Sequence, residues 1–163
     1  MADSASESRT ANGDAMTGLS FRPTLTSARE AHAAMELSAW SQAFLRGPGG
    51  NLGIADPLLE EDAINIYLLA EVDLRELHPC SGPDSEFDFP VPLDRYERTV
   101  EAMMRAFEAG WDAPPLFVHL KSFLLVDGTH RREALLRLGR DRYWAVLWMS
   151  RPPLIGRGQG PPW

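Results

Sequence analysis

Apolar residues recur at helical spacing between Val100 and Phe107, where they occupy positions i, i+3, i+4 and i+7. This stripe predicts an amphipathic helix that buries one of its faces. The run Asp-Arg-Tyr-Glu at 94–97 has the form of a capping box, and Gly110 follows the stripe as a stop signal. We therefore expect a helix that begins at this capping box and ends just before Gly110.

A second stretch with helical spacing lies nearer the start of the chain. It predicts one continuous helix from Ser27 to about Arg46, opened by a capping-box pattern at 27–30 and closed by the loop Gly-Pro-Gly-Gly at 47–50. The acidic run at 56–62 predicts one further helical turn.

Short apolar runs predict strands at 64–70, 115–119, 123–126 and 143–149. The second and third of these runs are close enough to form a hairpin with a tight turn near Lys121. Helices and strands alternate without an internal repeat, which predicts an α+β fold.

The pattern changes between the first strand and the helix that follows it. Residues 72–77 alternate apolar and charged side chains, which fits either a strand or the turn after one, and His78-Pro79 is expected to stop it. Residues 79–92 contain four prolines and predict a long loop. Loops of this length in compact domains are often lids or binding loops.

The most informative stretch is a strand that runs into Asp-Gly at 127–128 and then into a helix over 129–138. The first turn of a helix leaves backbone N–H groups unpaired, and these groups favour anions. This helix begins with Thr129, His130 and Arg131, which suit phosphate as the anion. The simpler alternative is an ordinary turn with a threonine N-cap.

Length and composition predict one domain with appended arms. The chain has 163 residues, of which 44% are hydrophobic. We expect a disordered tail over 1–25, a helical extension over 26–62, the main domain over 63–150, and a tail rich in Pro, Gly and Arg over 151–163. The extension has three open roles: a lid, a dimer contact, or a helix for a partner.

Charge is distributed unevenly along the chain. The net charge is −7, yet the segment from Asp127 to Trp163 has seven arginines against three acids. Because proteins that coat DNA are usually basic overall, this local basic region favours a small anion and argues against DNA.

The sequence also bears on compartment and on metal sites. No apolar run approaches the ~20 residues that span a membrane, and residues 1–17 do not have the pattern of a secretory signal. A single cysteine, Cys80, excludes an internal disulfide and a cysteine-based metal cage. We expect a cytoplasmic protein without a bound structural metal.

The order of elements and the motif Asp-Gly-Thr-His-Arg resemble the ParB/sulfiredoxin superfamily. In that family a first strand ends near a proline, a helix ends in glycine, and Pro-Pro-apolar opens a hairpin. The hairpin ends in Asp-Gly-His-His-Arg or a close variant, and the next helix ends in Leu-Gly. The similarity covers about residues 64–149, and the matching segments are 72–79, 96–110, 114–118, 127–131 and 138–139.

This resemblance implies a small mixed sheet with packed helices and a nucleotide site. Sulfiredoxins use ATP to repair an oxidised cysteine, partition proteins bind CTP and DNA, and free-serine kinases transfer phosphate from ATP or ADP to a small hydroxyl. For this chain it implies that Gly128, Thr129, His130 and Arg131 hold the phosphates of ATP or ADP, or of CTP. Mg²⁺ is implied with the nucleotide, because phosphoryl transfer needs its charge screened.

Departures from the family pattern favour the free-serine-kinase branch. Thr129 stands where sulfiredoxins have their catalytic cysteine, so sulfinic acid reduction is not expected. The chain ends within fifteen residues of its last predicted strand, which leaves no room for the DNA-reading domain of partition proteins. The kinase branch places a catalytic glutamate after the first strand's proline, where this chain offers Asp84 or Glu86.

The candidate catalytic residues are therefore Asp127, His130 and Glu86. Asp127 suits proton acceptance or metal binding, and its alternative is a turn residue favoured before glycine. His130 suits a phosphate donor, and an adjacent anion would favour its charged form. Arg132 and Arg137 are expected on a solvated helix face.

The leading hypothesis is a nucleotide-dependent enzyme that transfers phosphate from ATP or ADP to a small metabolite, or activates it. One alternative is a non-catalytic regulator that binds a nucleotide or DNA. A second is an enzyme that acts on an anionic metabolite without any nucleotide. A homodimer is compatible with each of them.

Overall fold

The computed structural model describes residues 21–51, 53–55 and 65–150. The disordered tail expected at the start, the helical turn expected at 56–62 and the tail expected after 150 lie largely or wholly outside these residues.

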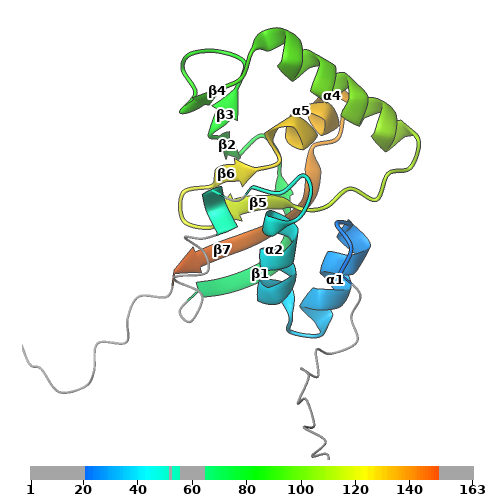
Figure 1. Ribbon diagram of the computed structural model, residues 1–163, viewed down its shortest axis with the longest axis vertical. Coiled ribbons are helices and arrows are strands. Elements are labelled where there is room, and N and C mark those ends of the chain that lie inside the picture. Colours follow the sequence, from blue (N-terminus) through cyan, green and yellow to red (C-terminus); the bar gives the residue numbers. More distant parts are fainter. Residues whose placement is uncertain (1–20, 52, 56–64, 151–163) are drawn as a thin grey trace, which may run out of the picture.

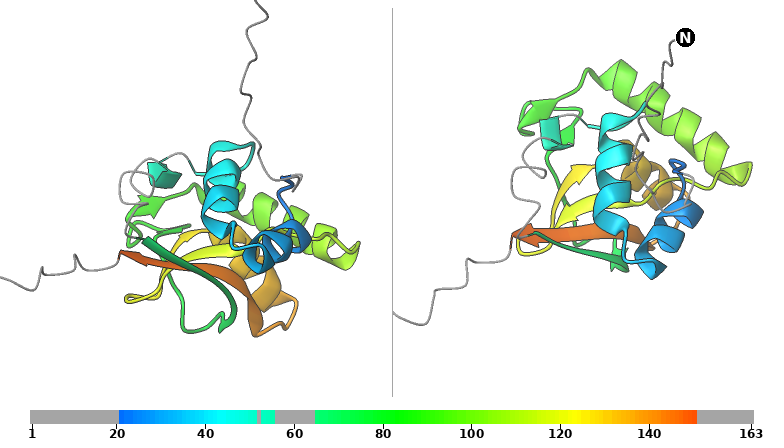
Figure 2. Two further views of the ribbon diagram at one scale, coloured as in Figure 1. Left: turned by 90° about the horizontal axis from the view of Figure 1, so that it is seen from below. Right: turned by 60° about the horizontal axis from the view of Figure 1, so that its bottom comes forward.

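A mixed five-stranded sheet forms the centre of an α+β fold, with helices on both of its faces (Figure 1, Figure 2). Two further short strands form a separate parallel pair. The strands are β1 (Asn65–Asp73), β2 (His78–Pro79), β3 (Ser81–Gly82), β4 (Phe89–Pro90), β5 (Leu116–His119), β6 (Leu124–Asp127) and β7 (Arg142–Ser150). The helices are α1 (Leu25–Ala33), α2 (Leu37–Arg46), α4 (Leu93–Glu108) and α5 (Thr129–Arg137).

The strand order in the sheet is β1-β7-β5-β6-β2. β1 pairs antiparallel with β7, and Leu69 faces Val146 in this register. β7 runs parallel to β5, and β5 and β6 form the antiparallel hairpin that the sequence predicts. The helix predicted after the hairpin is confirmed as α5, and the last predicted strand is confirmed as β7.

Alternating side chains on β5 supply both hydrophobic clusters. Leu116 and Val118 belong to the cluster beneath α4 and α5, whereas Phe117 belongs to the cluster beneath α1 and α2. Phe44 stacks on Phe117 with ring centroids 5.4 Å apart, and Trp40 stacks on Phe44 at the same distance. Successive strand residues point to opposite faces, so this short strand is buried on both sides.

The prediction of one helix from Ser27 to Arg46 is wrong, because the chain forms α1 and α2 with a break between them. Met35 has a φ of +59° and is 93% exposed. The N–H of Glu36 donates to the carbonyl of Ala31 at 2.7 Å, as in a helix ended by a left-handed residue. No glycine or asparagine marks this position, so helix-stop signals do not reveal it.

The capping box predicted at 27–30 is also wrong. The N-cap of α1 is Thr24, whose Oγ1 accepts from the N–H of Ser27 at 3.1 Å. Ser27 itself is buried in the first turn of the helix, where its hydroxyl accepts from Trp40 Nε1 at 3.1 Å. The packing of α2 against α1 therefore uses the side chain that local sequence assigns to a cap.

The helix predicted from the apolar stripe is confirmed as α4, but its capping box does not form. Pro92 occupies the N-cap position without a side-chain cap. Asp94 pairs instead with Arg98 at 3.1 Å, and Glu97 pairs with Arg137 on α5. Glu97 thus contributes to the contact between two helices rather than to the start of its own.

For residues 72–77, where the sequence fits either a strand or the turn after one, the structure contains both. β1 continues to Asp73, and residues 74–77 form a turn whose Leu74 and Leu77 are buried. His78-Pro79 does not simply stop a strand but forms β2, and the N–H of His78 donates to Phe123 O at 2.9 Å. The long loop predicted at 79–92 is pinned to the sheet at its first residues and contains β3 and β4.

Candidate functional site

Gly128 makes the turn from β6 into α5. Its φ is +103°, and it is the N-cap of the helix. A Cβ at this position would lie 2.5 Å from Leu116 Cδ2 and 2.9 Å from Arg131 Nη2. Both the backbone conformation and the close packing therefore require glycine.

The first turn of α5 presents unpaired donors. The N–H of Arg132 makes the first bond of the helix, to Gly128 O at 2.9 Å. The N–H groups of Thr129, His130 and Arg131 precede it, and no acceptor for them lies among residues 21–51, 53–55 and 65–150. The positive end of the helix dipole adds to the attraction for an anion at this turn.

Arg131 is held in the interior instead of at the surface. Its Nη2 donates to Asp127 Oδ2 at 2.7 Å and to Pro115 O at 3.3 Å. Its guanidinium lies 5.8 Å from the centre of the Phe44 ring, and 7% of the side chain is exposed. The structure thus gives Arg131 a packing role that joins α5 to β6 and to the residue before β5, where the sequence suggested a phosphate contact.

Asp127 is the other half of this pair. Its side chain is 14% exposed, and Oδ2 accepts from Arg131. This engagement keeps one carboxylate oxygen from acting as a base or a metal ligand while the pair is intact.

Ser81 on β3 touches the start of α5, a contact that sequence analysis missed. Its hydroxyl donates to Thr129 Oγ1 at 3.0 Å, and Thr129 is buried. The two residues are 48 positions apart. This contact depends on the fold of the 79–92 segment, so no local sequence pattern predicts it.

His130 is half-buried and packs against Tyr96 of α4, with ring centroids 4.9 Å apart and the rings tilted by 42°. Its Nε2 is buried and has no hydrogen-bond partner in the described part of the chain. Burial is the main cause that lowers the pKa of His130, and the positive charges of Arg131 and Arg95 lower it further. The imidazole is therefore neutral at pH 7 in a positive field.

Arg95 is the exposed cation in this region, one residue before Tyr96 on α4. Within the ranges that the structure covers, its side chain has no ion-pair or hydrogen-bond partner. Arg98, one turn further along, is paired with Asp94. Arg95 is thus available to a ligand, although the sequence makes it no more prominent than Arg98.

A cavity of about 480 Å³ adjoins this turn at Ser81. Its walls are mainly apolar, with a few polar groups. The lining residues are Asn51, Gly53, Ile54, Cys80, Ser81, Asp88, Phe89, Leu124 and Val126.

The structure does not bring Glu86 into this cavity. Glu86 is exposed and is absent from the lining, whereas Asp88, two residues on, is part of it. Cys80 also lies in the wall, with its Sγ 3.9 Å from Val126 O. Burial raises the pKa of the Cys80 thiol, and the charges of Asp88 and Asp127 raise it further. The thiol is therefore protonated at neutral pH.

Two arginines of α5 tie the helix to its neighbours. The prediction of a solvated face is wrong for Arg132, which is half-buried and donates from Nε to Leu74 O at 2.6 Å. Arg137 is exposed but bonds to both Glu97 and Glu133. Neither side chain faces the first turn as a free cation.

The described residues also bear on metal and membrane binding. Among the residues that the structure describes, no three His, Cys, Asp or Glu side chains gather closely enough to hold a metal ion. No helix in those residues combines the length and the apolar character needed to cross a bilayer.

Comparison with known proteins gives a similarity of fold. No protein-family model matches the chain, and no curated protein matches it. A solved structure of a Pnob8-like ParB-N domain is similar with a TM-score of 0.39 and 20% sequence identity. The match covers 52% of this chain and 30% of that one, so this chain spans under a third of that protein's length. The similarity concerns the backbone arrangement alone.

Proposed function

We propose that this chain binds a nucleotide through its phosphates at the first turn of α5, and that it uses the nucleotide to phosphorylate or activate a small metabolite. The observation that carries the proposal is a set of donors gathered at one turn. Three backbone N–H groups lie beside the hydroxyl of Thr129, the Nε2 of His130 and the guanidinium of Arg95, while the Ser81 hydroxyl donates to Thr129 Oγ1.

The electrostatics of the turn suit a phosphate group. Among the charges around His130, Arg131 and Arg95 lower its pKa and Asp127 opposes them with a smaller effect, so the potential at the ring is positive on balance. A phosphate placed there relieves this repulsion and raises the pKa of His130. The imidazole then becomes a charged donor to the anion, and such bonds are stronger than neutral ones.

The adjoining cavity provides space for the rest of the ligand. Its volume of about 480 Å³ lies within the range of about 300–1,000 Å³ typical of small-molecule sites. Leu124 and Val126 form an apolar wall, and Phe89 offers an aromatic ring at 66% exposure. A nucleoside or an acceptor metabolite fits this mixture of apolar and polar walls.

The proposed transfer is a displacement at the terminal phosphorus. The acceptor's hydroxyl oxygen forms a new bond to phosphorus, the bond from phosphorus to the bridging oxygen breaks, and the hydroxyl proton passes to a carboxylate. Asp88 is the carboxylate in the cavity wall and is our candidate base, in place of Glu86. Asp127 is occupied by Arg131, which makes it a poorer base than the sequence suggested.

Mg²⁺ would enter with the nucleotide, where it screens phosphate charge. It usually binds phosphates plus one or two carboxylates, so no larger protein cluster is needed. Asp88 and Asp127 both act on the pKa of Cys80 and so lie in one neighbourhood, which fits this requirement.

Calorimetric titration of the full chain tests binding. ATP, ADP, CTP and inorganic triphosphate are each added with and without Mg²⁺. Arg95→Ala is expected to weaken binding about tenfold, since a charged hydrogen bond to phosphate is lost. Arg98→Ala, on the same helix, is the matched control and should leave binding unchanged. Lack of binding by all four ligands would contradict the proposal.

A second assay separates catalysis from binding alone. Phosphorus NMR follows transfer from ATP or ADP to a panel of small hydroxyl compounds, with Asp88→Asn as the variant expected to bind but not transfer. Binding without transfer to any acceptor supports the regulatory alternative. Turnover of an anionic metabolite without nucleotide supports the third alternative.

A further inference from the structure

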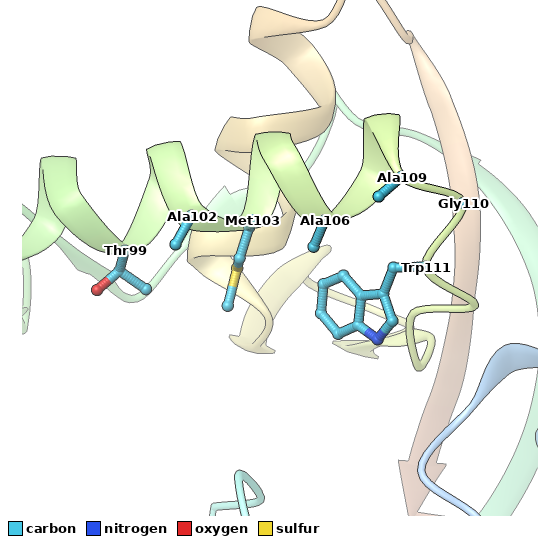
Figure 3. A pocket seen from close by; sticks show the side chains of 7 residues that line it. All are labelled: Thr99, Ala102, Met103, Ala106, Ala109, Gly110 and Trp111. Atoms are coloured by element: carbon cyan, nitrogen blue, oxygen red, sulfur yellow. The ribbon is translucent and has the colours of Figure 1, made fainter.

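A shallow apolar groove runs along α4, and none of its lining residues belongs to the proposed nucleotide site. Its volume is about 490 Å³. Figure 3 shows side chains of α4 projecting to one side of the helix, with the indole of Trp111 lying at its C-terminal end. The groove is lined by Thr99, Ala102, Met103, Ala106, Ala109, Gly110 and Trp111.

This groove lies beside the face of α4 that packs in the core, and Met103 borders both. Val100 and Phe107 are buried against the sheet and α5, whereas Ala102 and Ala109 are exposed. Trp111 is 37% exposed at the end of the groove. An exposed tryptophan is among the side chains enriched at the centres of interfaces.

Alternating charges follow one flank of the groove. Arg98, Glu101, Arg105 and Glu108 are all exposed and lie at spacings of three and four residues. Arg98 pairs with Asp94 in an exposed contact. In the part of the chain that the structure describes, Glu101, Arg105 and Glu108 have no ion-pair partner.

We infer that a second copy of this chain covers the groove, with the two α4 helices antiparallel about a two-fold axis at Met103. In this register Glu101 of each copy faces Arg105 of the other, and Arg98 faces Glu108. A two-fold axis across antiparallel helices brings the same flank of each helix together. The four charges are therefore complementary to themselves, whereas a parallel pairing would set like charges opposite.

The apolar part of the groove suits the same arrangement. Ala102 and Ala106 have short side chains, so two helices can approach to the lower end of the 8–10 Å usual for packed helices, or about 8 Å. Trp111 of each copy then extends over the first turns of the other copy's α4, where its exposed ring loses contact with water. The apolar centre supplies affinity, and the flanking charges set the direction and register of pairing.

The test uses charge reversal and sedimentation of the full chain over a wide range of concentrations. Wild-type protein is expected to be a dimer. Glu101→Arg and Arg105→Glu are each expected to weaken the dimer about tenfold, because each creates two like-charge contacts. An equal mixture of these two variants should regain wild-type affinity, because every facing pair is then opposite in sign.

The mixture separates pairing between copies from pairing within one helix, since mixing cannot repair an intramolecular contact. Glu76→Arg makes the same substitution in an exposed turn on another part of the surface and should leave the dimer intact. Ala106→Glu, at the centre of the groove, should give a monomer with an unchanged circular dichroism spectrum. A monomeric wild type, or a mixture that stays as weak as the single variants, would overturn the inference.

Discussion

Each end of α5 has an ion pair between residues four positions apart, and the two pairs differ in what they contribute to stability. Asp127–Arg131 at the first turn has side chains 14% and 7% exposed. Glu133–Arg137 at the last turn has side chains 28% and 34% exposed. The spacing and the chemistry are alike, but only the first pair is shielded from water.

This difference shows that burial, rather than residue type, decides what such a pair contributes. When a shielded charge loses its partner, water cannot take the partner's place, so the pair becomes essential to folding. When an exposed pair is broken, water solvates both charges, so the loss of stability is small. The first turn of α5 is consequently fixed in place by the fold, which is a suitable property for a binding turn.

The largest predicted effect comes from breaking the buried pair. Arg131→Ala is expected to lower the free energy of unfolding by about 3–5 kcal/mol, because it leaves Asp127 without its partner. Urea unfolding followed by circular dichroism measures this loss. The double variant Asp127→Asn with Arg131→Ala should lose less than the two single losses added together, and strict additivity would contradict the coupling.

The glycines at the two ends provide the second prediction. Gly128→Ala is expected to cost about 2–3 kcal/mol, because strain at a φ of +103° adds to the contact with Leu116. Gly139 has a φ of +74° but nothing within 4 Å of an added Cβ, so Gly139→Ala should cost only about 1 kcal/mol. The same unfolding assay compares them, and equal losses would show that packing around Gly128 is loose.

A third prediction concerns pH and the imidazole at the first turn. The folded state holds the pKa of His130 below its ordinary value of 6.5, so the unfolded chain binds more protons as pH falls through this range. Stability should therefore decline as pH is lowered from 7 toward the folded pKa. His130→Gln should flatten this part of the stability profile. A saturating phosphate ligand should raise the pKa of His130, which proton NMR of the imidazole detects.

The smallest effect is expected at the exposed end. Arg137→Ala removes bonds to Glu97 and Glu133, and its loss of stability should be well below that of Gly139→Ala. High salt should shrink it further, because exposed pairs are screened. A loss comparable to that of Arg131→Ala would remove the distinction between the two ends.

Local patterns were sufficient for much of the fold. The apolar stripe predicted α4, and the passage through Asp-Gly predicted the turn from β6 to α5. These elements are encoded by neighbouring residues. The break at Met35 and the pairing of β3 with β4 depend on packing between segments that are distant in the sequence. The propensities of neighbouring residues do not encode such packing.

The candidate site likewise contains features that neighbouring residues encode and features that depend on distant segments. Gly128, Thr129 and His130 could be proposed from the sequence because they share one motif, and their role stays a prediction. The contact of Ser81 with Thr129 could not be predicted, because Ser81 reaches the turn from another element. The burial of Arg131 was also not predictable, because an arginine at a helix start looks the same in sequence whether it faces solvent or the interior.

The position of β7 has a consequence for how the chain folds. The last described strand lies between β1 and β5, and its pairing with β1 joins Asn65 to Ser150. During synthesis β1 therefore cannot pair with β7 until nearly the whole domain has left the ribosome. Such long-range closure slows folding and leaves intermediates vulnerable to aggregation. A nascent chain that stops before β7 should remain sensitive to protease, and protection should appear only when β7 is inserted between β1 and β5.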